Sequence, residues 1–145
     1  MLSSLFLSKN QKLVKKWKRE HEEIVVLATH VLSEYSKNNI KSAKKLLKKL
    51  NIVAVDHVMN EDLEFYKLLK DQKRLTETNE KSILQFKKSF KNTKLTLMTF
   101  LSKYSRDDVE LDDTFFKSFN DLVDVLAKRI DFEENNLYTI LNQKQ

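Results

Sequence analysis

The side chains in this sequence best suited to bind a metal are His21, His57, Glu61 and Glu133. Two of them form the pattern His57-x-x-x-Glu61, which places an imidazole and a carboxylate one turn apart on the same face of a helix. Imidazole and carboxylate ligands suit iron, manganese or zinc. This spacing is common by chance, but His21 on a separate helix strengthens the signal. The sequence therefore suggests a site for one metal ion between helices.

The composition gives little support to other reaction chemistry. The chain has no cysteine, which excludes disulfides, thiol catalysis and zinc–thiolate sites. It has no glycine and therefore no Gly-rich loop that could cradle a phosphate. Its three histidines do not support a Ser-His-Asp arrangement, and acid pairs such as Glu133-Glu134 are interpreted as solvated faces or caps. We therefore expect a protein that is not an enzyme.

The elements that must position these residues are four long helices. The chain of 145 residues contains neither glycine nor proline, whereas average usage is about 7% and 5%, and a sheet protein needs such residues in its turns. Apolar residues recur at spacings of three and four, which is typical of helices. We predict helices over 9–36, 40–70, 80–104 and 114–142. Short links favour antiparallel neighbours, so we predict an all-α, antiparallel up-down-up-down four-helix bundle forming a single domain over residues 1–145.

Local signals mark the ends of these helices. Ser8 and Gln11 form a capping-box pattern before the first helix. Asn38-Asn39 suits the break between the first two helices, and residues 76–79 supply caps for the third. The acidic stretch 106–113 is interpreted as a loop and a cap, because carboxylates favour the positive end of the helix that follows.

Several polar residues interrupt the apolar stripes near the middle of the helices. Burying such groups is costly unless they are paired or bound to metal. Because several helices contribute, we expect one polar site inside the bundle, where this architecture builds its sites. His30 lies nine positions after His21 and is expected to face away. The residues on the stripes are His21, His57, Glu61, Arg129, Glu133 and, less securely, Lys94.

Three segments resemble the hemerythrin-like, or HHE cation-binding, family. They are Arg19–Ile24 in the first helix, Val55–Tyr66 in the second and Arg129–Tyr138 in the fourth. In that family the first segment supplies a histidine, the second a His-x-x-x-Glu motif, and the last a His-x-x-x-Glu-Glu motif followed by an apolar-aromatic pair. The resemblance implies a four-helix bundle around a di-iron site built from five histidines and two carboxylates.

The chain departs from this family at most of the iron ligands. No histidine follows His57, and Arg129 stands where the histidine of the fourth helix is expected. The remaining residues could hold one metal ion but not a di-iron centre. The leading interpretation is a degenerate site without a cofactor, in which the fixed charge of Arg129 replaces the metal by bridging Glu61 and Glu133. One bound metal, iron included, and another small ligand are the alternatives.

A second resemblance is to the regulator of sigma D family, bacterial bundles that bind the main sigma factor. It is carried by Leu13–Trp17, by Val55–Val58 with Tyr66, and by residues 126–134. It implies a protein partner and no metal chemistry. The expected function is thus a non-enzymatic, hemerythrin-like regulatory or interaction module of a bacterium, with a protein partner that the sequence does not identify. The alternatives are a metal-binding sensor or carrier and a sigma-factor-binding regulator.

The net charge of +6 is unevenly distributed. Residues 1–49 carry 12 basic and 4 acidic side chains, whereas residues 106–145 carry 5 and 10. These regions can attract each other within the bundle or in a homodimer. No arginine-rich or aromatic-interleaved stretch accompanies the lysines, which disfavours nucleic acid as a partner. No apolar run is long enough to span a membrane, the apolar segment 1–7 is interpreted as an arm packed on the bundle, and we expect a cytoplasmic protein.

Overall fold

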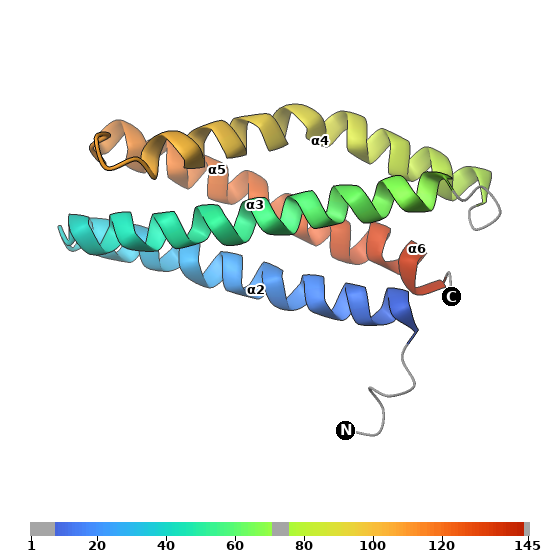
Figure 1. Ribbon diagram of the computed structural model, residues 1–145. Coiled ribbons are helices and arrows are strands. Elements are labelled where there is room, and N and C mark those ends of the chain that lie inside the picture. The colour runs from blue at the N-terminus through green and yellow to red at the C-terminus, as the bar shows by residue number, and fades with distance from the viewer. Residues whose placement is uncertain (1–7, 71–75, 144–145) are drawn as a thin grey trace, which may run out of the picture.

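The computed structural model describes residues 8–70 and 76–143 of the chain (Figure 1). Within these ranges the chain forms helices and no strands, so the all-α prediction is confirmed. The predicted N-terminal arm, residues 1–7, lies outside the described residues. The helices are α2 (Lys9–Ser36), α3 (Ile40–Lys70), α4 (Glu77–Tyr104), α5 (Asp113–Phe132), the π-helical turn η1 (Glu133–Leu137) and α6 (Tyr138–Gln143).

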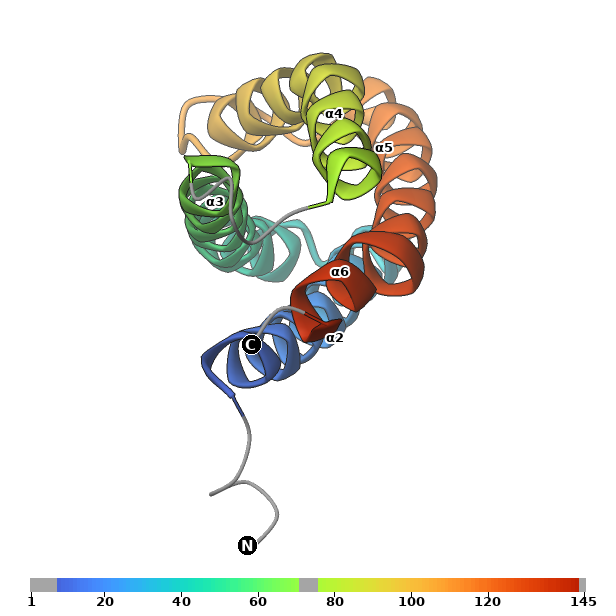
Figure 2. The ribbon, with the colours of Figure 1, turned by 90° about the vertical axis from the view of Figure 1, so that its right-hand side faces the viewer.

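The four long helices run alternately in opposite directions along one axis (Figure 1). Viewed along that axis, α2, α3, α4 and α5 follow one another around a shared interior, and α6 lies against α2 (Figure 2). The predicted antiparallel up-down-up-down bundle is therefore confirmed. No helix in the described ranges is long and apolar enough to cross a membrane.

The predicted helix ends are largely those of the structure. The Ser8 hydroxyl accepts from the Gln11 N–H at 3.1 Å while the Ser8 N–H donates to Gln11 Oε1 at 2.9 Å, which is the predicted capping box. Asn38 has a φ of 64°, a left-handed conformation that asparagine tolerates and that ends α2. The Asp112 carboxylate accepts from the Phe115 N–H at 2.8 Å and caps α5.

Two predicted boundaries differ from the structure. The third helix begins at Glu77 rather than residue 80, because the Thr76 hydroxyl accepts the Asn79 N–H at 3.1 Å and so acts as the cap itself. The fourth helix is not continuous, since η1 interrupts it between Phe132 and Tyr138.

Buried apolar side chains form two clusters along the bundle axis. Each cluster draws on all four sides of the bundle, so each end has its own core. One cluster consists of Ile24, Leu27, Ala28, Val31, Ala43, Leu47, Leu50, Ala54, Leu97, Leu101, Tyr104, Leu111, Phe115, Phe119 and Leu122. The other consists of Val14, Trp17, Phe65, Leu68, Ile83, Phe86, Phe90, Leu137, Tyr138, Ile140 and Leu141. Trp17 is fully buried.

A polar layer separates these two clusters. Along α2, His21 lies between Trp17 of one cluster and Ile24 of the other. Along α3, His57 and Glu61 follow the last residue of the first cluster and precede the first residue of the second. The fold therefore places the candidate ligands near the middle of the bundle, enclosed by apolar side chains at both ends.

Lys44 of α3 fastens the connection between α4 and α5. Its ammonium group donates to the backbone carbonyls of Tyr104, Arg106 and Val109 at 2.6, 2.7 and 2.5 Å. These carbonyls lie at and just beyond the end of α4, where the helix dipole places partial negative charge. The ammonium thus satisfies acceptors that the helix itself leaves unpaired.

We predict that Lys44→Met lowers the free energy of unfolding by about 1–3 kcal/mol, because it keeps the aliphatic stem and removes the charged donor. Chemical denaturation followed by circular dichroism measures the change. Lys49→Met removes an exposed lysine of the same helix and should change stability by less than about 0.5 kcal/mol. Equal stability of the two variants would contradict the anchoring role.

Candidate metal centre

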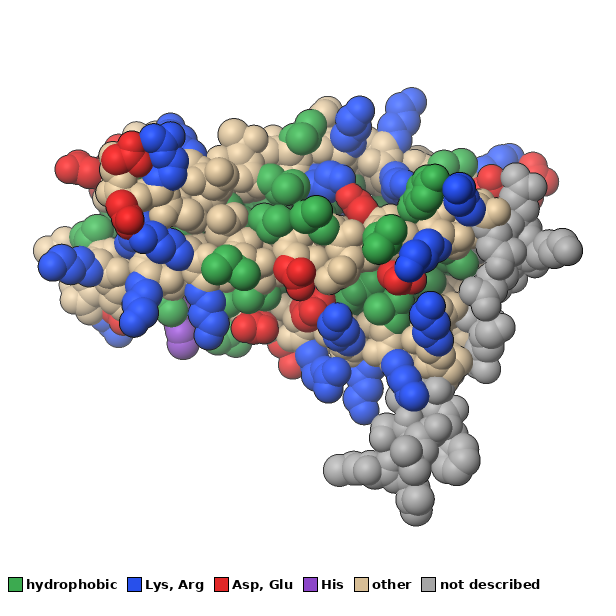
Figure 3. Space-filling view, viewed as in Figure 1, with side chains coloured by type: hydrophobic (Ala, Val, Ile, Leu, Met, Phe, Trp, Pro, Cys, Tyr) green, Lys and Arg blue, Asp and Glu red, His purple; other side chains and the backbone are tan. Residues whose placement is uncertain are grey.

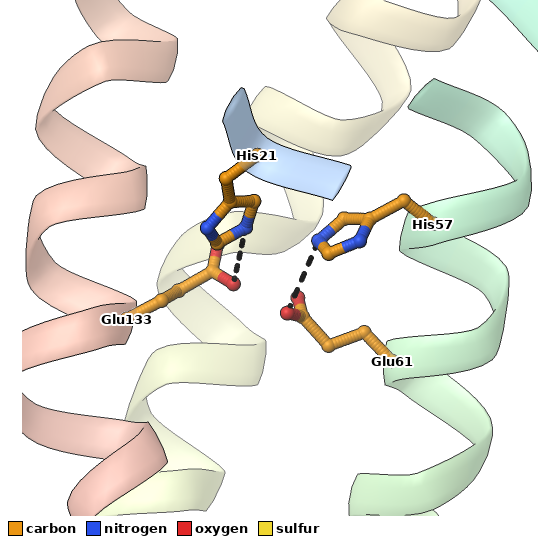
Figure 4. A group of neighbouring side chains, drawn as sticks. All are labelled: His21, His57, Glu61 and Glu133. Carbon is orange, nitrogen blue, oxygen red and sulfur yellow. Dashed lines mark ion pairs between the residues drawn. The ribbon is translucent and has the colours of Figure 1, made fainter. Parts of the chain in front are cut away.

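Four buried side chains from three elements converge at the polar layer (Figure 4). His21 comes from α2, His57 and Glu61 come from α3, and Glu133 comes from η1. One ligand atom of each residue lies within 4.8 Å of those of the other three. None of the four residues is more than 4% exposed. The structure thus brings together all four residues that the sequence proposed as metal ligands.

Both imidazole rings are oriented by carboxylates outside this cluster. His21 Nδ1 lies 2.7 Å from Glu134 Oε2, and His57 Nδ1 lies 2.8 Å from Glu20 Oε1. A proton on each Nδ1 satisfies these contacts and leaves the inward-facing Nε2 as the donor atom for a metal. Metal-binding histidines are commonly held in this way, because the carboxylate fixes the tautomer and increases the basicity of the ring.

Glu20 and Glu134 were not predicted as site residues. Their side chains are 18% and 30% exposed, and each stands beside a stripe residue in the sequence. The Glu133-Glu134 pair was expected to be solvated. That expectation is wrong for Glu133, which is buried, and Glu134 is held by its contact with His21.

Tyr138 completes the cluster. Its hydroxyl donates to Glu61 Oε2 and lies 3.2 Å from both Glu133 Oε2 and His21 Nε2. The residue is 1% exposed, and its ring stacks on that of His21 with centroids 5.6 Å apart. In the sequence, Tyr138 stands out only as the last residue of the hemerythrin-like segment Arg129–Tyr138. It was therefore not predicted as a site residue.

The π-helical turn explains how Glu133 and Tyr138 reach the same spot. In an α-helix, side chains five residues apart differ in direction by about 140°. In η1 the N–H of Tyr138 bonds to the carbonyl of Glu133, five residues earlier, so the two side chains lie on one face. The prediction of an unbroken helix over 114–142 is wrong here, because the extra residue in the turn lets both polar side chains face inward.

Arg129 does not bridge the two buried glutamates. Its guanidinium carbon lies 5.2 and 4.9 Å from the ring centroids of Phe86 and Phe90, and one N–H donates to Ser89 Oγ at 3.2 Å. No ion pair joins Arg129 to a carboxylate in the part of the chain that the structure describes. The predicted bridge from Arg129 to Glu61 and Glu133 is therefore wrong, because cation–π contacts hold the guanidinium against α4. The Arg129 charge still acts on Glu133 and lowers its pKa, although burial and Glu61 outweigh this effect.

The other polar candidates lie apart from the cluster. His30 is exposed, as expected from its position relative to His21. Lys94 forms an ion pair with Asp62, a partly exposed residue of α3. Within residues 77–104, α4 therefore contributes no ligand to the candidate centre.

The pKa values of the two inner glutamates, Glu61 and Glu133, shift in opposite directions. Burial, and then the negative charge of Glu61, raise the pKa of Glu133 well above its ordinary value. Burial alone would also raise the pKa of Glu61, but the hydrogen bonds of its neighbours, that of His57 foremost, outweigh burial and lower it. Without metal, these shifts favour a proton on Glu133 over one on Glu61.

The two imidazoles shift in opposite directions. Burial lowers the pKa of His21, and repulsion from His57 lowers it further against the pull of Glu134. Burial acts the same way on His57, but its contacts with Glu61 and Glu20 outweigh burial and raise the pKa. Burial, followed by the nearby glutamates, also raises the pKa of Tyr138, which keeps the phenol protonated in the absence of metal.

His57 and Glu61 form a buried ion pair in the metal-free cluster. His57 Nε2 lies 3.3 Å from Glu61 Oε2 without the alignment of a regular hydrogen bond. A cation among these ligand atoms would give Nε2 a partner, and two imidazoles with two carboxylates form a donor set that fits iron, manganese or zinc. The residues present therefore fit a single metal ion.

A small cavity adjoins the cluster. It measures about 30 Å³ and is bordered by His21, His57, Glu133 and Arg129 together with apolar residues such as Ile24 and Ala54. This volume is close to that of one water molecule in the liquid. The cavity can therefore admit a water-sized ligand beside the two imidazoles.

The raised pKa of Glu133 predicts that the metal-free protein loses stability at high pH. Its folded-state pKa lies above the unfolded value near 4.5, so its contribution is complete below that value and is lost as the pH rises through the folded pKa. Glu133→Gln keeps the shape and cannot ionise. In chelator, it should therefore become more stable than the wild type at the high end of a pH series, by on the order of 1–3 kcal/mol.

Urea denaturation at each pH measures this difference. Glu110→Gln, which neutralises an exposed carboxylate, is the matched control and should follow the wild type throughout. Parallel stability curves for the wild type and Glu133→Gln would show that Glu133 is not a buried titrating group.

Comparisons with known proteins do not assign this chain to a family. A scan against models of protein families found no match, and searches among curated proteins and solved structures found no similar protein. The hemerythrin-like resemblance therefore remains a proposal. The function has to be inferred from the geometry of the bundle interior.

Proposed function

We propose that this protein is a metal-binding four-helix bundle that holds one transition-metal ion between His21, His57, Glu61 and Glu133. The observation that carries this proposal is the orientation of the two imidazoles. Outer carboxylates hold both Nδ1 atoms, so both Nε2 atoms face the two buried glutamates. The competing interpretation, a metal-free ion-pair network, included a bridge by Arg129, whose guanidinium instead packs on the ring of Phe90.

The donor set and the cavity support a role in binding a small ligand at the metal. Two imidazoles and two carboxylates suit iron, and they leave coordination positions that these four residues do not fill. The cavity of about 30 Å³ borders three of the four ligands. We therefore propose a hemerythrin-like sensor or carrier with one ion in place of two, in which the protein holds the metal and limits the size of what reaches it.

Metal titration by calorimetry, with metal analysis of protein purified without chelator, tests this function. The wild type should bind one Zn²⁺ or Fe²⁺ per chain. His57→Gln and Glu61→Gln each remove a ligand and should weaken binding by roughly 100-fold or more, whereas Glu20→Gln and Glu134→Gln remove outer carboxylates and should weaken it by about 10–100-fold. His30→Gln changes an exposed histidine and is the matched control.

The order of these effects separates a built site from adventitious binding. Binding to surface histidines would respond to His30→Gln and would be indifferent to Glu20→Gln. A wild-type protein that binds no metal under these conditions would overturn the proposed function.

A second candidate function, a protein-interaction module, is favoured by an exposed apolar face of α3. Ile52, Met59, Leu63 and Tyr66 are 70%, 61%, 50% and 49% exposed, and their spacings of seven, four and three place them on one side of the helix. Figure 3 shows apolar side chains spread over the face formed by α3 and α4, with both basic and acidic side chains around them. We call these four residues the α3 apolar face.

The charges around the α3 apolar face suggest the chemistry of its partner. Lys70 and Lys87 lie 5.2 and 6.0 Å from the centroid of the Tyr66 ring. An apolar strip with two lysines at its Tyr66 end complements an amphipathic helix that carries acidic residues at the matching end of its apolar side. We propose such a helix of a partner protein as the occupant, which includes the sigma-factor-binding alternative.

Co-purification from the source cells at low and high salt tests this candidate. Met59→Glu/Leu63→Glu should reduce recovery of an acidic partner more than about tenfold, because it places charge in the apolar strip. Val25→Glu/Val26→Glu alters exposed apolar residues of α2 and should retain the partner. Recovery that is unchanged by the α3 variant, or a partner without an acidic amphipathic helix, would exclude this surface.

A further inference from the structure

We propose that Tyr138 is a fifth metal ligand, which binds as a phenolate and makes the site favour ferric iron over divalent ions. This inference rests on the proposed metal-binding function and deepens it. It assigns a donor beyond the His21, His57, Glu61 and Glu133 cluster, and with that donor it assigns a preferred metal.

The position of the phenol oxygen carries the inference. It is hydrogen-bonded to Glu61 Oε2 and lies 3.2 Å from Glu133 Oε2 and from His21 Nε2. Two donor atoms that each lie about 2.1 Å from a metal, at right angles to each other, are about 3 Å apart. The two spacings of 3.2 Å are thus close to those of neighbouring atoms in one coordination sphere, and a metal held by His21 and Glu133 would be within reach of the phenol oxygen.

The surroundings of Tyr138 hold the oxygen in this place. The residue is 1% exposed. Its ring stacks on His21 with an interplanar angle of 12°, and it packs against Trp17 with centroids 5.4 Å apart. The backbone bond from the Tyr138 N–H to the Glu133 carbonyl fixes the π-helical turn beneath it. A side chain packed in this way cannot turn toward solvent, so its oxygen remains part of the polar layer.

Charge balance determines which ion the phenolate favours. On coordination the O–H bond of Tyr138 breaks, its electron pair forms the bond to the metal, the proton passes to solvent, and the oxidation state of the metal does not change. Glu61, Glu133 and the phenolate then carry three negative charges beside two neutral imidazoles. Around these donors, the Arg129 guanidinium at the cavity offsets only one of the outer carboxylates Glu20 and Glu134. A trivalent ion neutralises the donors, whereas a divalent ion would leave one more negative charge in a buried site, which is costly.

The cavity lies apart from this fifth donor. Tyr138 is not among the described residues that border it, whereas His21, His57 and Glu133 are. Five protein donors and one water-sized position would complete six-coordinate iron. Divalent ions, by contrast, would leave the phenol protonated and hydrogen-bonded to Glu61.

Iron reconstitution tests the inference. The protein is loaded with Fe²⁺ without oxygen and then oxidised with ferricyanide. The wild type should develop the intense visible absorption of a tyrosinate–iron(III) charge-transfer transition, and Tyr138→Phe should lack it. Tyr138→Phe should weaken Zn²⁺ binding only by about tenfold, as for loss of a hydrogen bond to the ligand Glu61, but should lose Fe³⁺ to a competing chelator with an affinity weakened by more than about 100-fold, as for loss of a ligand. Tyr66→Phe changes an exposed tyrosine and should behave as the wild type.

Two outcomes distinguish failure of this inference from failure of the metal site. A wild type that binds neither Zn²⁺ nor Fe²⁺ overturns both. A wild type that binds both ions but shows the same ferric absorption as Tyr138→Phe overturns the role of Tyr138 alone. Should Tyr138→Phe fail to fold, resonance Raman spectra of the oxidised wild type decide the matter: enhanced phenolate ring vibrations support the ligand, and their absence excludes it.

Discussion

The interior of this bundle depends on two contacts between imidazole and carboxylate. Glu134 and Glu20 hold the Nδ1 atoms of His21 and His57, and this leaves both Nε2 atoms facing the same spot. The outer carboxylates are partly exposed, so water offsets much of the cost of their charge. The inner carboxylates have no such help and must share protons or bind a cation. The outer carboxylates are negatively charged, and the imidazole Nε2 atoms and inner carboxylates offer lone pairs at the centre. This arrangement is suited to holding a positive ion.

The helices tolerate this polar layer because the apolar core is divided. The clusters above and below it each join all four sides of the bundle, so burial stabilises both ends independently of the middle. The π-helical turn adds to this division, since it lets Glu133 and Tyr138 share a face that an α-helix would deny them. Local departures from regular structure are expected where a protein exchanges stability for function.

Periodicity and capping chemistry predicted most of the fold from the sequence. The bounds of α2 and α3 agree with the prediction at both ends, because the helical spacing continues along the whole of each stripe and their connection contains the asparagine that ends α2. The π-helical turn could not be predicted in this way, since a spacing of five brings no side chains together on an α-helix. Arg129 was misplaced because a stripe position fixes the direction of Cα–Cβ but not the end of a long side chain, which here lies on two phenylalanine rings.

The outer residues of the site illustrate a different limit. Glu20 and Glu134 occupy half-solvated positions where carboxylates are ordinary, so composition and spacing give them no distinction. Only the three-dimensional path of α2, α3 and η1 brings each within hydrogen-bond distance of an imidazole on another element. The same arrangement of α2, α3 and η1 raises the pKa of Glu133 and of Tyr138, which favours the protonated form of both side chains when no metal is bound. Protons and metal would then compete for the same oxygen atoms, so the occupancy of the centre should depend on pH as directly as on metal concentration.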